Sequence, residues 1–313
     1  MPPASAPDAV LKPDPPHYAW NNALPPKLEV ISGNVVAFET RDAGDGSFAP
    51  GATTAALAGY EFRGHPLTGP VFIQGAQPGD MLQVDILSVT PAAHGWTAVV
   101  PGMGLLAEDF SEPHLRIWDL ADGQVGRLDD VARVPLDPFC GVMGLAWAEP
   151  GEHTTMPPRR TGGNMDIKQL VAGSTLYLPV DVAGGLFSVG DAHAAQGDGE
   201  VCVSAIEMSS TATLRFTVRT DLHLPEPQFR TPGVRARGSA GACYVTTGHG
   251  PDLMLATKQA VRYMLDHLEA EYKLSRPDAY VLASVAVDLK ISEVVDAPNW
   301  IVSAFLPLDL FGA

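Results

Sequence analysis

The chain has 313 residues, a formal net charge of −16 and 46% hydrophobic residues, which is the composition of a globular protein. An acidic surface repels phosphate backbones, so nucleic acid is not an expected partner, and no run of about 18 apolar residues is present to span a membrane. The 31 glycines and 28 prolines favour many turns and short strands over long helices.

Neither the N-terminal segment nor the cysteines indicate secretion. Residues 1–26 are predicted to form an extended surface arm, because three Pro-Pro pairs disfavour helix. This arm lacks a basic region followed by an apolar run, so it is not expected to be a signal peptide. The three cysteines form no CxxC pair and cannot all pair with one another, which favours a reducing, cytoplasmic location.

Period-two hydrophobic patterns predict that strands dominate the rest of the chain. Apolar residues alternate over 81–89 (MLQVDILSV), 213–220 (TLRFTVRT) and 282–291 (LASVAVDLKI), as in half-buried strands. The runs 175–182 (TLYLPVDV) and 199–208 (GEVCVSAIEM) are less regular and are predicted to be strands buried on both faces.

One long helix is predicted near residues 251–274. Pro251 and Asp252 suit its first turn, and six residues recur near helical spacing: Leu253, Ala256, Ala260, Met264, Leu268 and Tyr272. A short helical turn is expected in 275–283. No GxGxxG or GxxxxGK[ST] motif is present, so a nucleotide cofactor has no support. The predicted fold class is therefore mainly β (α+β), with a sandwich-like or barrel-like body and a few helices. Residues 27–313 are expected to form a single domain, and a division into two β-rich subdomains stays open.

The segment LFSVGDAHAAQGDGEV, residues 186–201, is rich in metal-ligand side chains. Asp191, His193, Asp198 and Glu200 offer carboxylate oxygens and an imidazole, which are donors that zinc accepts. The glycines between them let the backbone turn tightly. The alternative is a polar turn between two strands. Because apolar runs flank the segment, we expect a loop held by a rigid scaffold.

Three other segments offer further candidates. Asn164 and Asp166 lie in RTGGNMD, His65 lies in FRGHPLTG, and Glu39 lies at the expected end of a strand in FETRDAGDG. A lone histidine before a proline is also compatible with a structural role.

Nucleophilic catalysis has weaker support. The sequence around Ser188, LFSVG, lacks the first glycine of the GxSxG elbow. Each cysteine is compatible with a nucleophile beside a histidine, but also with a small buried apolar residue.

Several of these segments together resemble the acetamidase/formamidase family. The motifs are HPLTGPVFIQGAQPGD, GGNMD, LFSVGDAHAAQGDGEV, AIE, TTGHGPDLMLATKQA, SRPDAYVLASVAVDLKISEVVD and LPLDLF, from about residue 27 onward. The resemblance implies a β-rich amide hydrolase that converts a short aliphatic amide such as formamide or acetamide to ammonia and a carboxylate. It also implies a homodimer or higher homo-oligomer and a bound divalent metal, with zinc or calcium as candidates.

The resemblance also implies roles for individual residues. Asp166, Asp191 and His193 would be metal ligands, and Asp198 is added to them as a donor of the same segment. Glu200 would be a ligand or the general base, while Glu39 and His65 match positions near the site. Asn164 is the expected donor to the developing oxyanion.

Three alternatives remain open from the sequence. Thr161 and Trp147 depart from the family pattern, where histidine and proline are usual, and motivate a hydrolase of a larger amide on the same scaffold. The second alternative is a metal- or ligand-binding β protein without catalysis. The third is a cysteine-dependent amidase that uses Cys140 or Cys202.

Overall fold

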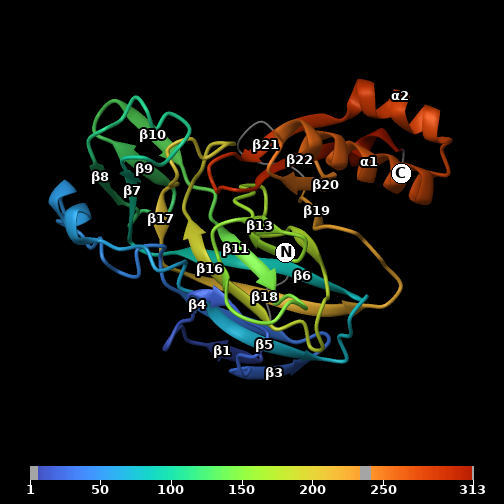
Figure 1. The fold of residues 1–313 in the computed structure, drawn as a ribbon, viewed down its shortest axis with the longest axis horizontal. Helices are drawn as coiled ribbons and strands as arrows, with labels where there is room; N and C mark the ends of the chain where they lie inside the picture. The colour runs from blue at the N-terminus through green and yellow to red at the C-terminus, as the bar shows by residue number, and fades with distance from the viewer. Residues whose placement is uncertain (1–5, 233–240, 312–313) are drawn as a thin grey trace.

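Two large β-sheets form the body of the protein in the computed structural model, which describes residues 6–232 and 241–311 (Figure 1). The first sheet contains, in spatial order, β1 (Ala9–Leu11), β4 (Val35–Thr40), β18 (Ser210–Arg219), β6 (Met81–Pro91), β15 (Thr175–Pro179), β19 (Gln228–Arg230), β20 (Cys243–Gly250), β22 (Trp300–Pro307) and β21 (Asp288–Glu293). The second contains β13 (Pro158–Arg159), β14 (Gly162–Asn164), β11 (Phe139–Leu145), β16 (Phe187–His193), β17 (Glu207–Met208), β7 (His94–Val99) and β8 (His114–Asp119). At β16 this sheet is extended by β5 (Thr68–Gln74), which pairs with β3 (Leu28–Ile31).

Smaller elements complete the fold. Two-stranded sheets are formed by β9 (Val125–Leu128) with β10 (Ala132–Pro135) and by β2 (Ala19–Trp20) with β12 (His153–Thr154). The helices are η1 (Thr54–Gly59), α1 (Leu253–Tyr272), α2 (Arg276–Ala286) and η2 (Leu308–Leu310). The prediction of a mainly β fold with a few helices is confirmed. No helix among the described residues is both long and apolar enough to cross a membrane.

The main core lies between the two large sheets. Phe38 of β4 and Phe216 of β18 come from the first sheet, and Phe187 of β16 comes from the second. The ring of Phe187 lies 5.8 Å from that of Phe38 and 4.9 Å from that of Phe216, in edge-to-face geometry that favours aromatic pairs. These contacts fix the start of β16 against the first sheet, and the far end of the same strand carries Asp191 and His193.

The strands predicted from alternation at 81–89 and 213–220 are confirmed. They lie in β6 and β18, and these two strands pair with each other. Leu82, Val84 and Ile86 are buried, as are Leu214 and Phe216. The run 175–182 contains β15, whose Leu176, Tyr177 and Leu178 are all buried, as expected for a strand covered on both faces.

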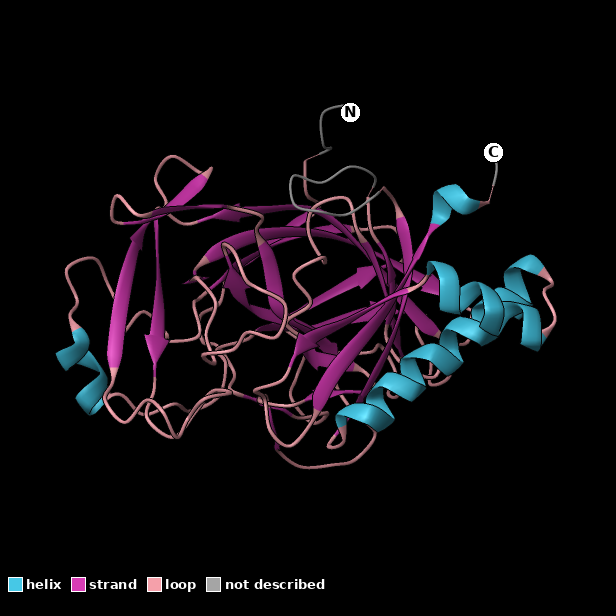
Figure 2. Ribbon diagram, turned by 90° about the horizontal axis from the view of Figure 1, so that it is seen from above, coloured by secondary structure: helices cyan, strands magenta, loops and turns pink. Residues whose placement is uncertain are grey.

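The long predicted helix is confirmed as α1. Asp252 caps it by accepting a hydrogen bond from the Leu255 amide at 2.7 Å, and a left-handed Lys273 ends it. Its face of Ala256, Ala260, Met264 and Leu268 packs on β20 and β22. Figure 2 shows α1 and α2 together at one end of the molecule, outside the sheets.

The strand predicted over 282–291 is largely wrong. Residues up to Ala286 belong to α2, and only β21 follows as a strand. Ser275 caps α2 by accepting from the Asp278 amide, and Pro277 occupies the first turn. This helix-start signal overrides the alternation. As a result, Val285, predicted to be on the buried face, is 76% exposed.

The predicted strand over 199–208 is also wrong, except for β17 at its end. No strand is formed in the described segment between His193 and Glu207, and Glu200 and Val203 have positive φ angles of 47° and 69°, as in turns. The segment is a loop, and the Gly199 amide donates to the Ser292 carbonyl at 3.0 Å. This bond ties the loop to β21 and brings two distant parts of the chain together.

The N-terminal segment joins the body through two short strands. β1 pairs in parallel with β4, and β2 pairs with β12. Trp20 is only 2% exposed and packs with Leu67, Val142 and Trp147.

A candidate metal centre in the second sheet

Strand β16 carries the two central donors of the site. All seven of its residues are buried, and Asp191 and His193 lie at its end. Asp191 has a φ of 53°, an uncommon conformation for a residue other than glycine. The expectation that these donors lie on a loop is therefore wrong. The small residues next to them, Gly190 and Ala192, gave no hydrophobic alternation from which the strand could be recognised.

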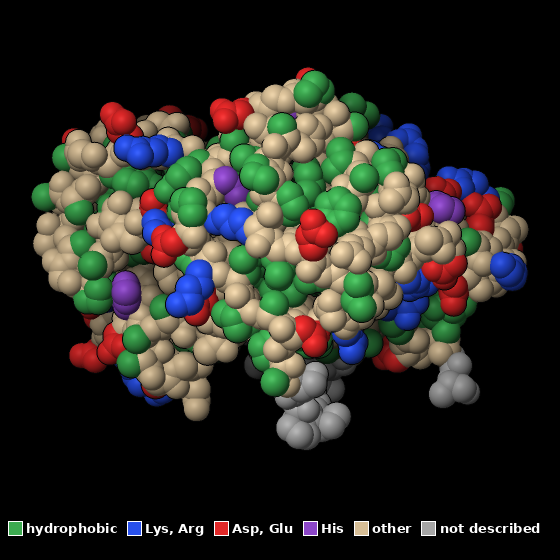
Figure 3. All heavy atoms as spheres, turned by 90° about the horizontal axis from the view of Figure 1, so that it is seen from below, with side chains coloured by type: hydrophobic (Ala, Val, Ile, Leu, Met, Phe, Trp, Pro, Cys, Tyr) green, Lys and Arg blue, Asp and Glu red, His purple; other side chains and the backbone are tan. Residues whose placement is uncertain are grey.

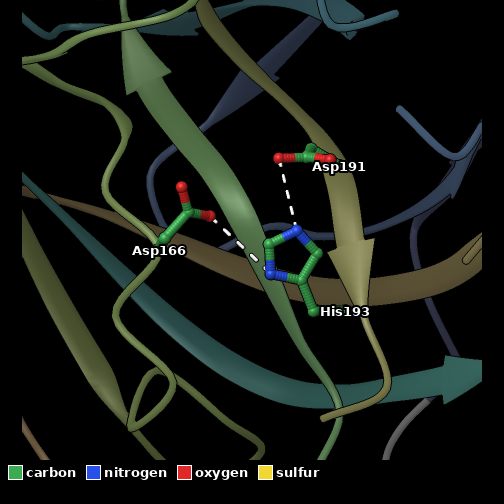
Figure 4. Close-up of side chains that lie close together, drawn as sticks. All are labelled: Asp166, Asp191 and His193. Carbon is green, nitrogen blue, oxygen red and sulfur yellow. Dashed lines mark ion pairs between the residues drawn. The ribbon is translucent and has the colours of Figure 1, made fainter. Parts of the chain in front are cut away.

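His193 lies among three carboxylates. Its Nε2 is 3.4 Å from Asp191 Oδ2, and its Nδ1 is 3.7 Å from Asp166 Oδ1 (Figure 4). Its Nε2 also lies 3.1 Å from Glu207 Oε2. A second histidine also approaches Asp191: His65 Nε2 lies 3.7 Å from Asp191 Oδ2. Of the predicted site residues, Asp166, Asp191, His193 and His65 therefore lie close to one another.

Asp166 also lies beside a second set of carboxylate side chains. Glu200 and Asp296 join Asp166 there, and Asp296 Oδ2 accepts a hydrogen bond from Asn164 Nδ2 at 2.5 Å. Three sets of donor atoms lie within 4.8 Å of one another among the described residues: Asp166–Asp191–His193, His193–Glu200–Glu207 and Asp166–Glu200–Asp296. We call the residues of these three sets the acidic cluster.

A glycine forms one wall of the acidic cluster. A Cβ atom at Gly141 of β11 would collide with Asp166 Oδ1 and would lie 2.9 Å from His193 Cε1 and 3.0 Å from Asp191 Oδ2. Only a residue without a side chain therefore leaves the space among these groups open.

The buried donors fit a divalent cation. Asp166 Oδ1, Asp191 Oδ1, His193 Nε2 and Glu207 Oε2 are buried and have no hydrogen-bond partner. Unsatisfied buried polar atoms are costly, and a cation would satisfy several at once. One imidazole with several carboxylates is a donor set that zinc accepts.

Burial places much negative charge inside the protein. Six carboxylates of this region are buried: Asp166, Asp191, Glu200, Glu207, Glu293 and Asp296. The outer face drawn in Figure 3 instead intersperses acidic with basic side chains. The formal net charge of −16 therefore counts several acidic side chains that lie in the interior.

The pKa values of the cluster follow from burial and from neighbouring charges. Burial raises the pKa of Glu200 well above its usual range, and Asp166 raises it further. Burial and Asp191 raise the pKa of Glu207 to about 8, against the lowering effect of His193. Burial alone would lower the pKa of His193, but Glu207 and Asp191 raise it well above its ordinary value.

We expect the metal-free protein to lose stability as pH rises from about 5 to 8. Glu207 and Glu293 have folded-state pKa values of about 8, above the ordinary 4.5, so the folded state binds more protons than the unfolded state in this window. The free energy of unfolding then falls by about 1.4 kcal/mol per pH unit for each group that is protonated in the folded state and ionised in the unfolded state. Urea unfolding midpoints with and without excess zinc check this, and zinc should flatten the decline. Metal-free stability that rises over this window would contradict it.

Four predicted site residues lie outside the acidic cluster: His65 and Asn164, which contact Asp191 and Asp296 of the cluster, and Asp198 and Glu39. Asp198 is exposed, and its carboxylate pairs with Lys168 at 2.9 Å. Glu39 is half-buried on β4, where its carbonyl accepts from Thr68 Oγ1. Neither belongs to a candidate donor set of the described residues.

Other cluster residues were missed in the sequence. Glu207 and Asp296 join the donor sets, Gly141 forms the wall, and Gln196 contacts His193. A carboxylate inside an otherwise apolar run, as in SAIEM, was the available signal for Glu207. Asp296 had no comparable local signal.

The cysteines and Trp147 give little support to the other chemistries. All three cysteines are free, and burial raises the pKa of Cys140 to about 12, which disfavours its thiolate. Trp147 packs beneath Arg159, whose guanidinium carbon lies 3.8 Å from the ring centroid. Trp147 also packs in one hydrophobic cluster with Trp20.

Comparison with known proteins places the chain in one family. A sequence model of the "Acetamidase/Formamidase family" matches residues 7–150 and 146–313. A formamidase of Methylophilus methylotrophus is 26% identical over 94% of this chain and 89% of its own. An acetamidase of Mycolicibacterium smegmatis is 29% identical over 62% of this chain and 63% of its own. The crystal structure of an acetamidase from Bacillus halodurans superposes with a TM-score of 0.88 at 32% identity, covering 96% of this chain and 98% of that one.

Proposed function

The chain belongs to the acetamidase/formamidase family and is an amide hydrolase, and we propose that it cleaves short aliphatic amides with water activated at the acidic cluster. The names of the relatives support formamide and acetamide as the substrate class. The observation that carries the role of the cluster is the set of unpartnered buried donors around His193.

His193, Asp191 and Glu207 would hold the cation, because His193 Nε2 faces both carboxylates, and Asp166 and Glu200 belong to the neighbouring donor sets. A divalent cation bound there lowers the pKa of water and polarises the amide carbonyl. Zinc is the proposed metal because an imidazole takes part, and calcium is the alternative because carboxylates predominate.

Glu200 is the proposed general base. Burial raises the pKa of Glu200 well above its ordinary value, so its carboxylate is a stronger proton acceptor than an exposed one. It takes a proton from the attacking water as the C–O bond forms. It then returns the proton to the amide nitrogen as the C–N bond breaks, so that ammonia and a carboxylic acid leave, and the acid ionises to the carboxylate.

His65 and Asn164 have supporting roles in this proposal. His65 Nδ1 is paired with Thr155 Oγ1 at 3.0 Å, which fixes the ring so that Nε2 faces Asp191. It is the second candidate proton donor to the departing nitrogen. Asn164 donates a hydrogen bond from its side-chain amide to Asp296. It therefore fixes that carboxylate in addition to its proposed role as a donor to the oxyanion.

The test is ammonia release from formamide, acetamide and propionamide, and from larger amides. We expect turnover of the short amides, loss of turnover after complete metal removal, and recovery on adding zinc. Full activity of demonstrably metal-free protein would exclude the metal role. Turnover of the larger amides alone would exclude the proposed substrate class.

Assembly and location stay predictions. Homo-oligomer formation is checked by light scattering of the purified protein. A reducing, cytoplasmic location is compatible with three free cysteines.

A further inference from the structure

Gln196 contacts the acidic cluster through both ends of its side-chain amide. The proposed mechanism gives this residue no role. It lies three residues after His193, and its side chain is 8% exposed. Its Oε1 lies 2.9 Å from His193 Nδ1. Its Nε2 donates to the Asp166 carbonyl at 2.7 Å and reaches the Ser292 carbonyl at 3.5 Å.

These contacts fix the orientation of the Gln196 amide. The carbonyl oxygens of Asp166 and Ser292 can only accept hydrogen bonds, so the NH₂ group must face them. The Oε1 atom then faces His193, and it can only accept. His193 Nδ1 must therefore carry the proton.

The protonated Nδ1 determines which nitrogen of His193 is free to bind a cation. With Nδ1 as the donor, only Nε2 keeps an available lone pair once its own proton is lost. Nε2 is buried without a hydrogen-bond partner and faces Asp191 Oδ2 at 3.4 Å and Glu207 Oε2 at 3.1 Å. Asp166 instead lies on the Nδ1 side, at 3.7 Å.

We propose that Gln196 is a positioning residue that holds His193 in the Nδ1–H form and so selects Nε2, with Asp191 and Glu207, as the cation-binding set. This assignment rests on the proposed metal-dependent function. In this assignment, Asp166 is not a ligand of the cation that binds at Nε2. It belongs instead to the donor set with Glu200 and Asp296.

Three segments meet at this one side chain. Gln196 follows β16, Asp166 follows β14, and Ser292 lies in β21 at the edge of the first sheet. The same amide therefore orients the imidazole and holds the backbone of Asp166 and Ser292 around it. Outer hydrogen-bond partners of this kind typically change metal affinity by about 10–100-fold when removed.

The first test is zinc affinity, measured by competition with a chromophoric chelator. Gln196→Met removes both the acceptor and the donor, and we expect zinc affinity to fall about 10–100-fold. Gln196→Glu keeps an acceptor for Nδ1–H, and we expect it to recover most of the lost affinity. An affinity equally low in both variants would contradict the proposed role.

Gln169→Met is the matched control. Gln169 is also a buried glutamine, but its amide donates to Asp198 Oδ1 and not to the acidic cluster. Its variant should bind zinc as the unmodified protein does. An equal loss of affinity in the control would show that any buried amide deletion has this effect.

The second test uses the unmodified protein, so it does not depend on whether a variant folds. Nitrogen-15 NMR of the zinc-loaded protein, with His193 assigned by its loss in His193→Asn, reports which ring nitrogen is protonated. We expect Nδ1–H and zinc-bound Nε2. Zinc bound through Nδ1 would overturn this assignment alone, whereas a protein that binds no zinc would overturn the proposed function as well.

Discussion

Replacing His193 with alanine is expected to abolish most amide turnover and cation binding together. His193 offers the only imidazole in the candidate donor sets of the described residues, and its Nε2 lies between Asp191 and Glu207. Without it, zinc loses a nitrogen ligand and the carboxylates lose their buried positive neighbour. Since cation stabilisation of a transition state contributes several kcal/mol, turnover should fall roughly 1,000-fold or more. Ammonia release and metal content of the same preparation measure both effects.

His267→Ala is a suitable control for that variant. His267 is also a largely buried histidine, but it stacks on Tyr244 between α1 and β20. Its loss should leave zinc content and turnover unchanged while lowering thermal stability. A His193→Ala protein that keeps its zinc and at least a tenth of the original turnover would remove His193 from the site.

Replacing Gly141 with alanine is expected to close the cation site without removing any donor. The new methyl group would collide with Asp166 Oδ1 and crowd His193 and Asp191. The φ angle of Gly141 is not among the positive ones, so alanine suits the backbone and the effect is local. A displacement of about 1 Å at a catalytic centre costs on the order of 100-fold in rate, so turnover should fall by at least that factor. Zinc titration together with ammonia release checks it.

Gly59→Ala provides the comparison for Gly141→Ala. Gly59 also lacks a positive φ, and a Cβ there would meet no atom within 4 Å. This variant should match the unmodified protein in both assays. If Gly141→Ala bound zinc with unchanged affinity, the space next to Gly141 would not be the cation site.

Local physical signals predicted the elements whose own residues determine them. The α1 helix follows from its cap and its buried stripe of Ala256, Ala260 and Met264. The β6 and β18 strands follow from alternation against a single core. The prediction failed over 282–291, where two signals competed and the helix cap at Ser275 prevailed.

The candidate site was predicted only where its donors are close in the sequence. Asp191 and His193 are two residues apart, so their shared role was visible in one segment. Glu207 and Asp296 reach them through strand pairing and through the β21–β22 connection, which no local pattern encodes. Asp198 has the right chemistry and lies in the right segment, but Lys168 holds it at the surface.

The contacts that tie the 196–200 loop to β21 have a consequence for the newly made chain. Asp296 comes after every other donor of the acidic cluster in the sequence, and it sits in the turn between β21 and β22. During synthesis, the earlier carboxylates emerge from the ribosome well before their last companion. Gln196, which orients His193, also contacts Ser292 of this late hairpin. The imidazole therefore reaches its final orientation only after the hairpin has docked, so full metal affinity would report completion of folding rather than its beginning.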